Sequence, residues 1–349
     1  MAQSASQWRG WDEIDNIFVF GDSYTATGFE PNGTQPNPSN AFGNPAFPGR
    51  TFSNGRNWID FLTLNYNDSY VSTYNFARGG ASIDSFGSES IFRPFDHQVD
   101  RFFLPFYAEN NVNLTTWRPD NTLFATFFGI NDVNFFYKMD NRTEYAALIS
   151  DTYTKYMEKL YRAGARNFLI MNVPPIHRAP FTVAEGDRNV ARNKESVEDF
   201  NGRIMDMASG MIQKHEDIAV YLLDTYSLYN EVLDDPQSRT ETTGYRNTTG
   251  SCPAYSKRTY NEDENSDDCG RPQREFFWLD ALHPTPPIHR AMAAEIAAQL
   301  RGNEVLTADR SSSRPSRNGS SSRFSVISMS TWMCFAVGHL AVLWMGSVI

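Results

Sequence analysis

Apolar runs of strand length recur along the chain and alternate with segments long enough for helices. The apolar runs are Ile17–Phe20, Val71–Phe76, Leu123–Phe128, Phe168–Asn172 and Val220–Asp224. The segments of helical length are Arg56–Leu64, Phe92–Ala108, Tyr145–Arg162, Asn189–Lys214 and Pro286–Leu300, the last with Thr285 as a candidate N-cap. The first three runs are almost continuously apolar, as is typical of parallel strands covered by helices on both faces. The pattern predicts an α/β fold, a three-layer α/β/α sandwich around a mainly parallel five-stranded sheet.

Two polar stretches interrupt this alternation, and both are interpreted as loops on the rim of a site. The first is Gly33–Arg50, rich in Pro, Gly and Asn, and the second is Pro236–Arg274. The second contains Cys252 and Cys269, which predict a local disulfide, although two unpaired surface thiols are the alternative. Metal binding is disfavoured, because neither cysteine has a CxxC partner or a histidine at zinc spacing.

The two ends of the chain differ from its middle. The first residues lack the basic start and apolar run of a secretory signal, so the chain opens almost directly on the first strand, as a trimmed or mature protein would. We expect one domain over residues 1–303, a Ser-rich linker over 304–325 and an apolar tail over 326–349. The tail fits either a GPI-attachment signal or a membrane-spanning helix, and a buried core helix is the third alternative.

Localisation at the cell surface or outside the cell is expected from the tail, the cysteine pair and the glycosylation sequons together. The sequons begin at Asn32, Asn67, Asn113, Asn141, Asn247 and Asn318. The chain has 349 residues, a formal net charge of −10 and scattered basic residues, which argue against nucleic acid as a partner. Its 40% hydrophobic content is ample for a core, and a neutral substrate is easier to accommodate than an anionic one.

Candidate chemistry lies just after the first apolar run and just before the last predicted helix. Ser23 follows the first strand, at the sheet edge where open α/β folds bind their ligands. Asp280 and His283 stand three residues apart in the sequence FFWLDALHPT. An imidazole can take the proton of a serine at neutral pH, and a carboxylate on the other ring nitrogen fixes the tautomer. Each segment alone is also consistent with a turn or a helix cap.

Two further motifs follow the second and third runs at the same sheet edge. They are NFARGGAS, with Gly79 and Gly80, and FFGINDVN, with Asn131. A tetrahedral intermediate needs donors placed where negative charge develops. A glycine lets a backbone N–H approach closely, and an asparagine amide supplies another donor.

These four motifs, in this order, resemble the SGNH/GDSL hydrolase family over about Ile17–Leu300, which implies a flavodoxin-like sheet. The resemblance implies that Ser23 is the nucleophile and first oxyanion donor, with Gly80 and Asn131 as the other donors. It implies His283 as the base and Asp280 as its orienting partner. Gly80 is chosen over Gly79 because the glycine of the family typically falls five residues after an asparagine like Asn75. The GxSxG pentapeptide of ordinary lipases is absent.

Within that family the motifs look most like fungal GDSL acetylesterases that act on plant cell-wall saccharides. The expected partner is a small ester or an acetylated saccharide, bound by a monomer that uses no cofactor. Aromatic residues in or near the predicted rim segments could stack on sugars, although Trp58 and Phe136 are expected to pack inside. They are Tyr24, Phe42, Phe47, Trp58, Phe135, Phe136 and Trp278. The alternatives are a lipase or lysophospholipase on the same scaffold and a non-catalytic surface carbohydrate-binding protein.

Overall fold

The protein is described by a computed structural model over residues 8–85, 93–108, 115–257 and 259–306. The sequons at Asn113 and Asn318, Cys334 and the apolar tail lie outside the described residues. Within the described ranges, no helix is both long and apolar enough to cross a membrane.

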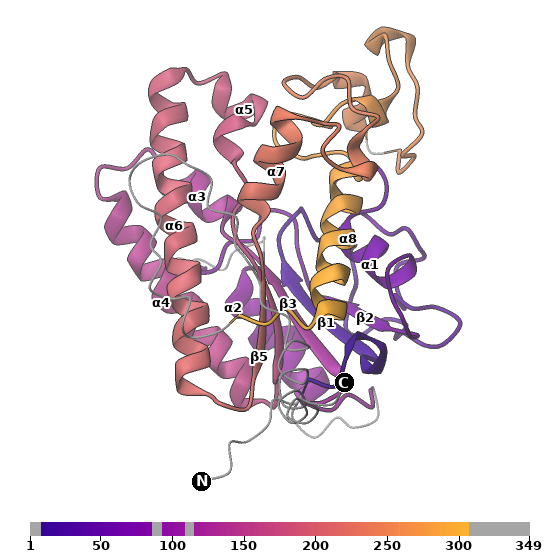
Figure 1. Ribbon diagram of the computed structural model, residues 1–349, viewed down its shortest axis with the longest axis vertical. Helices are drawn as coiled ribbons and strands as arrows, with labels where there is room; N and C mark the ends of the chain where they lie inside the picture. Colours follow the sequence, from indigo (N-terminus) through magenta and orange to yellow (C-terminus); the bar gives the residue numbers. More distant parts are fainter. Residues whose placement is uncertain (1–7, 86–92, 109–114, 258, 307–349) are drawn as a thin grey trace, which may run out of the picture.

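A five-stranded parallel sheet forms the centre of the molecule, in the order β2-β1-β3-β4-β5 (Figure 1). Its strands are β1 (Asn16–Gly21), β2 (Ser72–Asn75), β3 (Thr122–Phe127), β4 (Asn167–Met171) and β5 (Ala219–Leu223). Each strand lies within one residue of a predicted apolar run. The predicted α/β sandwich is therefore confirmed. The strand order reverses direction at β1, which is the point where such sheets bind ligands.

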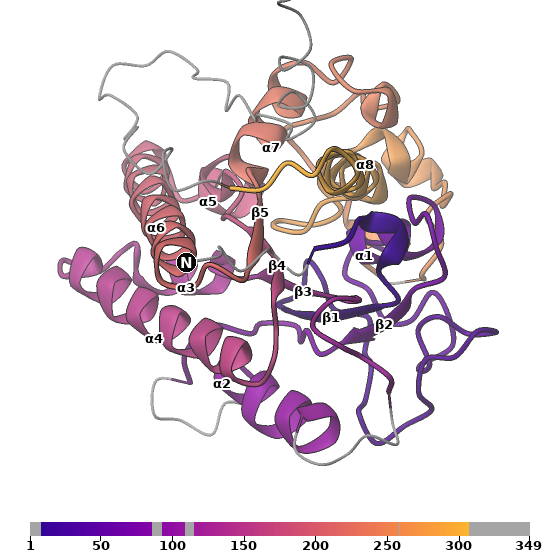
Figure 2. The same cartoon turned by 60° about the horizontal axis from the view of Figure 1, so that its bottom comes forward.

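Helices cover both faces of the sheet, which makes the three layers visible in Figure 2. On one face α1 (Trp58–Leu64) packs against α8 (Pro286–Gly302). On the other face lie α2 (Phe95–His97) with the π-helix that follows it (Gln98–Ala108), α4 (Arg142–Arg162) and α6 (Asp187–Lys214). Three shorter helices were not predicted: α3 (Ile130–Phe136), α5 (Pro180–Val183) and α7 (Thr225–Asp234). Single turns of 3-10 helix occur at Trp11–Glu13, Ile176–Arg178, Thr240–Thr242, Pro253–Lys257, Asp267–Cys269 and Gln273–Glu275.

Aromatic side chains fill the core. Phe18 on β1 is fully buried, and its ring lies 5.0 Å from that of Phe103 and 4.9 Å from that of Tyr74. Trp58 is also fully buried at the start of α1, where its indole N–H donates to Thr25 Oγ1 at 3.0 Å. The preceding Asn57 caps α1 by accepting the backbone N–H groups of Ile59 and Asp60. These contacts fix α1 against the segment that follows β1.

The structure confirms the predicted N-cap of α8 and corrects the placement of one loop. Thr285 is the N-cap residue, and its hydroxyl donates to the carbonyl of Phe276 instead of accepting a helix N–H. The Gly33–Arg50 loop was expected on the site rim. Its middle instead lies along the outer edge of β2, where Thr73 N–H donates to the carbonyl of Ala41 at 2.8 Å.

The boundary of the folded domain also lies later than residue 303. Leu306 N–H donates to the carbonyl of Val220 on β5 at 2.8 Å, and the hydroxyl of Tyr221 donates to Asn303 Oδ1. Val305 and Leu306 pack against the core, because the chain turns back along β5 after α8 ends. Residues 304–306, expected in the linker, therefore belong with the domain.

Candidate active site

Ser23 lies immediately beyond the carboxyl end of β1, on a turn with several fixed backbone contacts. The side-chain amide of Gln98 pairs with Gly21 in both directions, donating to its carbonyl at 2.9 Å and accepting its N–H at 3.0 Å. One residue later, Asp22 Oδ1 accepts the N–H of Tyr24 at 2.9 Å. These bonds bracket Ser23, which is 5% exposed, and hold its side chain in one place.

Asp280 and His283 lie on a tight loop before α8. Trp278 and Pro284 pair across the base of the loop, and Leu279 N–H donates to the carbonyl of His283 at 2.8 Å. Asp280 Oδ1 accepts the backbone N–H of His283 at 2.7 Å, so the carboxylate closes its own turn. The spacing of three residues therefore has a structural reason, since it places the carboxylate beside the ring of the histidine.

The fold brings these side chains together from opposite ends of the chain. His283 Nε2 lies 2.9 Å from Ser23 Oγ, and His283 Nδ1 lies 2.9 Å from Asp280 Oδ2. A carboxylate only accepts hydrogen bonds, so the Nδ1–H donates to Asp280 and Nε2 is left to accept the serine proton. The Tyr24 hydroxyl donates to the carbonyl of Leu282 at 2.6 Å and joins the nucleophile turn to the histidine loop. This arrangement can activate a serine for attack on an acyl group.

The electrostatics of the loop favour an ionised Asp280. Burial of its side chain raises the pKa, but hydrogen bonds from the His283 ring and from the backbone N–H groups of His283 and Leu282 outweigh that effect. The net result is a pKa below the usual range. Asp280 can therefore carry a negative charge that would stabilise an imidazolium at His283.

The other two predicted oxyanion donors lie on the loop after β2 and in the first turn of α3. Gly80 has φ of +75°, in the left-handed region that glycine adopts readily, and follows β2. Asn131 is the second residue of α3, and its Nδ2 donates to the carbonyl of Ala81 at 2.8 Å. Its other contact, to Asp22 Oδ2, is long at 3.4 Å. The Asn131 amide therefore already holds the Gly80 loop through one N–H. Its second N–H, directed at Asp22, is available to donate a hydrogen bond to a substrate oxygen.

Asp132 holds the same loop from one residue further along α3. Its buried carboxyl accepts the N–H of Ile83 through Oδ1 at 2.9 Å. Asn131 and Asp132 thus fix the Gly80 loop at Ala81 and Ile83 respectively. The sequence indicated an oxyanion role for Asn131 but no role for its neighbour.

Asp22 is fully buried, and burial, with a smaller contribution from the nearby Asp132, raises its pKa to about 8. Between about pH 4 and pH 8 the native protein keeps this proton while the unfolded chain releases it, so rising pH lowers the free energy of unfolding. Asp22→Asn keeps the Oδ1 acceptor for Tyr24 and cannot ionise. We expect its melting temperature, relative to the unmodified protein, to increase from pH 5 to pH 8. A difference that stays constant between the two pH values would contradict the buried-proton assignment.

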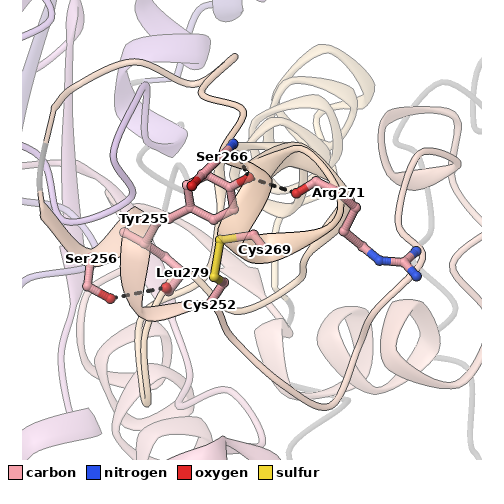
Figure 3. The surroundings of a disulfide bond; sticks show 7 residues. All are labelled: Cys252, Tyr255, Ser256, Ser266, Cys269, Arg271 and Leu279. Carbon is pink, nitrogen blue, oxygen red and sulfur yellow. Dashed lines mark hydrogen bonds between the residues drawn. A yellow bond between two sulfur atoms is a disulfide. The ribbon is translucent and has the colours of Figure 1, made fainter.

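The Pro236–Arg274 insertion supports the site from outside. A disulfide joins Cys252 to Cys269 (Figure 3). Beside it the Tyr255 hydroxyl accepts the N–H of Ser266 at 3.0 Å and donates to the carbonyl of Arg271 at 2.7 Å. Cys252 and Tyr255 form a small cluster with Phe276 and Leu279, which lie on the segment that leads into the Asp280 loop. The insertion therefore packs directly against the segment that carries the histidine.

The same insertion also contacts the turn before α1. Asn54 is fully buried with φ of +55°, and its Nδ2 donates to Gln273 Oε1 at 2.6 Å and to Glu264 Oε2 at 2.9 Å. Its Oδ1 accepts the N–H of Tyr260 at 2.7 Å, and Arg56 forms an ion pair with Glu262. The insertion thus connects the segment that leads to Asp280 with the turn before α1.

Replacing both Cys252 and Cys269 by serine should lower the free energy of unfolding. The loop between them has a sequence separation of 17, for which the chain-entropy model gives about 3 kcal/mol. Urea unfolding of the double variant, followed by circular dichroism, measures the loss. The single variant Cys334→Ser is the matched control, and equal stability of the double variant and the unmodified protein would contradict a stabilising bridge.

Most of the aromatic residues expected on the rim are buried instead. Tyr24, Phe42 and Trp278 are 1%, 7% and 1% exposed, and the Trp278 indole donates to the carbonyl of Thr248. Phe42 stacks on Phe47 within its own loop, at 5.7 Å between ring centroids. Trp58 and Phe136 pack in the core as expected, while Phe47 and Phe135 are exposed. A further aromatic side chain beside the site is Phe52, which the sequence did not single out: its ring lies 5.2 Å from that of His283.

Other supporting residues had no signal in the sequence. Gln98, Tyr24, Asn54 and Asp132 act through contacts with segments distant in the chain. Asn75 was noted only as a reference point for Gly80, and its amide donates to the carbonyl of Thr25 at 2.7 Å. In the part of the chain that the structure describes, no group of three or more His, Cys, Asp or Glu side chains could hold a metal ion.

Comparison with known proteins finds ester-hydrolysing enzymes among those similar to this chain. An acetylesterase of Thermothelomyces thermophilus is 31% identical over 293 residues, which cover 82% of this chain and 88% of that protein. The thermolabile hemolysin of Vibrio parahaemolyticus is 26% identical over 82% of this chain and 63% of its own length. A solved acetylxylan esterase from Geobacillus stearothermophilus covers 85% of this chain and 94% of its own, but at a TM-score of 0.45 and 12% identity it is too distant to bear on activity.

The protein is thus an enzyme that hydrolyses ester bonds. The family profile described as GDSL-like lipase/acylhydrolase matches residues 17–296, and the chain belongs to that family.

Proposed function

We propose that this enzyme hydrolyses esters of short acyl groups, above all acetyl, and so removes these groups from plant cell-wall saccharides. The observation that carries the proposal is the hydrogen-bonded series from Ser23 Oγ through the His283 ring to Asp280, with 2.9 Å at each step. The similarity to an acetylesterase over most of both chains supports the acyl group.

In the proposed reaction, Ser23 Oγ attacks the ester carbonyl carbon while His283 Nε2 takes the hydroxyl proton. The carbonyl π electrons move to oxygen and form a tetrahedral oxyanion. When this intermediate collapses, the bond to the alcohol oxygen breaks and His283 returns the proton to the leaving alcohol. Water then attacks the acyl-serine by the same steps, releasing the carboxylic acid and restoring Ser23. Asp280 stays ionised throughout, and its low pKa suits that role.

The oxyanion is assigned to the N–H groups of Ser23 and Gly80 and to the Asn131 amide. Support comes from their positions: Ser23 and Gly80 lie on the loops after β1 and β2, and Asn131 lies in the first turn of α3 after β3, where the carboxyl ends of parallel strands meet. Binding the oxyanion would exchange the long Asn131 contact with Asp22 for a charge-assisted hydrogen bond.

A series of 4-nitrophenyl esters tests the acyl preference. We expect kcat/KM to be highest for acetate and to fall through butyrate to decanoate, and we expect acetate release from acetylated xylan. A maximum at decanoate would favour a lipase or lysophospholipase. No hydrolysis of any ester by folded protein would favour a non-catalytic carbohydrate-binding role.

We also propose that the enzyme acts as a monomer at the cell surface, held there by the apolar tail, most simply through exchange for a GPI anchor. The proposal rests on the uncharged run over residues 325–349 that follows the Ser-rich segment. A chain that ends at Leu306, which keeps the β5 contact, should be soluble, monomeric and fully active. Phosphatidylinositol-specific phospholipase C should release the native enzyme from cells. Loss of activity on truncation, or resistance to the phospholipase, would argue against the anchor.

A further inference from the structure

Phe52 forms one side of the reacting centre, just before α1. Its ring lies 5.2 Å from the His283 ring at an interplanar angle of 32°, and the side chain is half-buried. The other end of the ring meets Gly79, where an added Cβ would lie 2.3 Å from Phe52 Cζ. The ring therefore extends from the catalytic histidine to the residue before Gly80.

The position of Phe52 relative to the leaving group follows from the reaction. His283 Nε2 must donate its proton to the departing alcohol oxygen, so the alcohol portion of the ester lies beside the imidazole. Tyr24 and Phe52 both lie beside that imidazole, at 5.8 Å and 5.2 Å between ring centroids. Tyr24 is 1% exposed and holds the carbonyl of Leu282, so a substrate cannot reach it. Phe52 is the ring that a substrate can contact.

The Phe52 backbone is held in a rigid turn. The hydroxyls of Thr51 and Ser53 both donate to the carbonyl of Gly55, and Ser53 Oγ makes its bond at 2.9 Å. The buried Asn54 next to them is fixed by the insertion through Gln273 and Tyr260. A ring mounted in this way is a surface of fixed orientation and loses little entropy on binding.

We propose that Phe52 is the surface on which the alcohol portion of the ester rests, and that it selects esters of ring-shaped alcohols such as pyranosides. A half-buried aromatic face offers a flat apolar contact of the kind that the C–H face of a sugar ring matches. This inference rests on the proposed ester hydrolysis and assigns its specificity to one residue. Phe52 acts by binding and takes no part in proton transfer.

The test compares acetyl esters that differ only in the alcohol: ethyl acetate, cyclohexyl acetate and an acetylated methyl xyloside. For Phe52→Leu we expect KM to rise roughly tenfold for the two ring alcohols, the size of one aromatic contact, with kcat retained. Ethyl acetate should change less than about twofold, because it is too small to use the ring face. Phe47→Leu, at an exposed phenylalanine stacked on Phe42, is the matched control.

The outcomes separate this inference from the proposed function. A parallel loss on all three esters would make Phe52 a packing support for His283, and unchanged KM values would remove it from the binding surface; either result overturns the inference. If the unmodified enzyme cleaves cyclohexyl acetate but not the xyloside, the saccharide proposal fails. In that case, a raised KM of Phe52→Leu for cyclohexyl acetate would still support Phe52 as the surface that binds the alcohol portion of the ester.

Discussion

Ser23→Ala is expected to lower kcat on 4-nitrophenyl acetate by about 10⁴-fold or more while the protein stays folded. The variant removes the atom that attacks the carbonyl, and the hydrogen bond it removes from the structure is the one between Ser23 Oγ and His283. The backbone turn survives, because Gly21 and Asp22 hold it through Gln98 and Tyr24. Rates and thermal melts measured on the same preparation check both parts of the prediction.

His283→Ala should cost about as much as Ser23→Ala, and the double variant little more, because the two side chains act as one unit. Asp280→Asn should retain more activity than either. Ser238→Ala, at an exposed serine in the segment after α7, is the matched control and should be fully active. A folded Ser23→Ala enzyme with normal activity would exclude the serine mechanism.

Asn131→Ala is expected to lower kcat by about 10²–10³-fold with little change in KM, the usual cost of one oxyanion donor. The structure adds a second reason for a loss, since the Asn131 amide also holds the carbonyl of Ala81 beside Gly80. Asn131→Asp removes the donor but keeps the size of the side chain, so it should be nearly as impaired. Steady-state kinetics on 4-nitrophenyl acetate provide the measurement.

Asn134→Ala serves as the control for this pair, because Asn134 lies one turn further along α3 and its Oδ1 has no hydrogen-bond partner among the described residues. We expect it to leave kcat unchanged. If Asn131→Ala instead raised KM at constant kcat, Asn131 would be a substrate-binding or capping residue and the oxyanion assignment would be wrong.

The strands and the proposed reacting groups could be predicted from the sequence for different reasons. Parallel strands buried on both faces must be apolar throughout, so Ile17–Phe20 and Leu123–Phe128 stand out from the helices around them. Ser23, Asp280 and His283 were found because each follows a strand or precedes a helix within a recognisable motif. Local periodicity was sufficient to predict the strands, and local motifs were sufficient to predict these candidate site residues.

Contacts between distant segments could not be predicted in the same way. Phe52 looks like any other aromatic residue until the turn of Asn54 places its ring beside His283. Gln98 belongs to a segment expected simply as a helix, yet it supports the nucleophile turn 77 residues away. The short helix α5 was missed because four residues are too few to show a helical period.

The segments that run beside the two outer strands have a consequence for self-association. An uncovered edge strand presents a row of backbone N–H and C=O groups to which a strand of another chain can bind. Here Ala41 accepts from β2 at one edge, and Leu306 donates to β5 at the other. Short irregular segments, one of them rich in proline and glycine, occupy the positions where a sixth strand would begin. These segments occupy part of each outer edge and so limit edge-to-edge pairing with another chain, at residues far from Ser23.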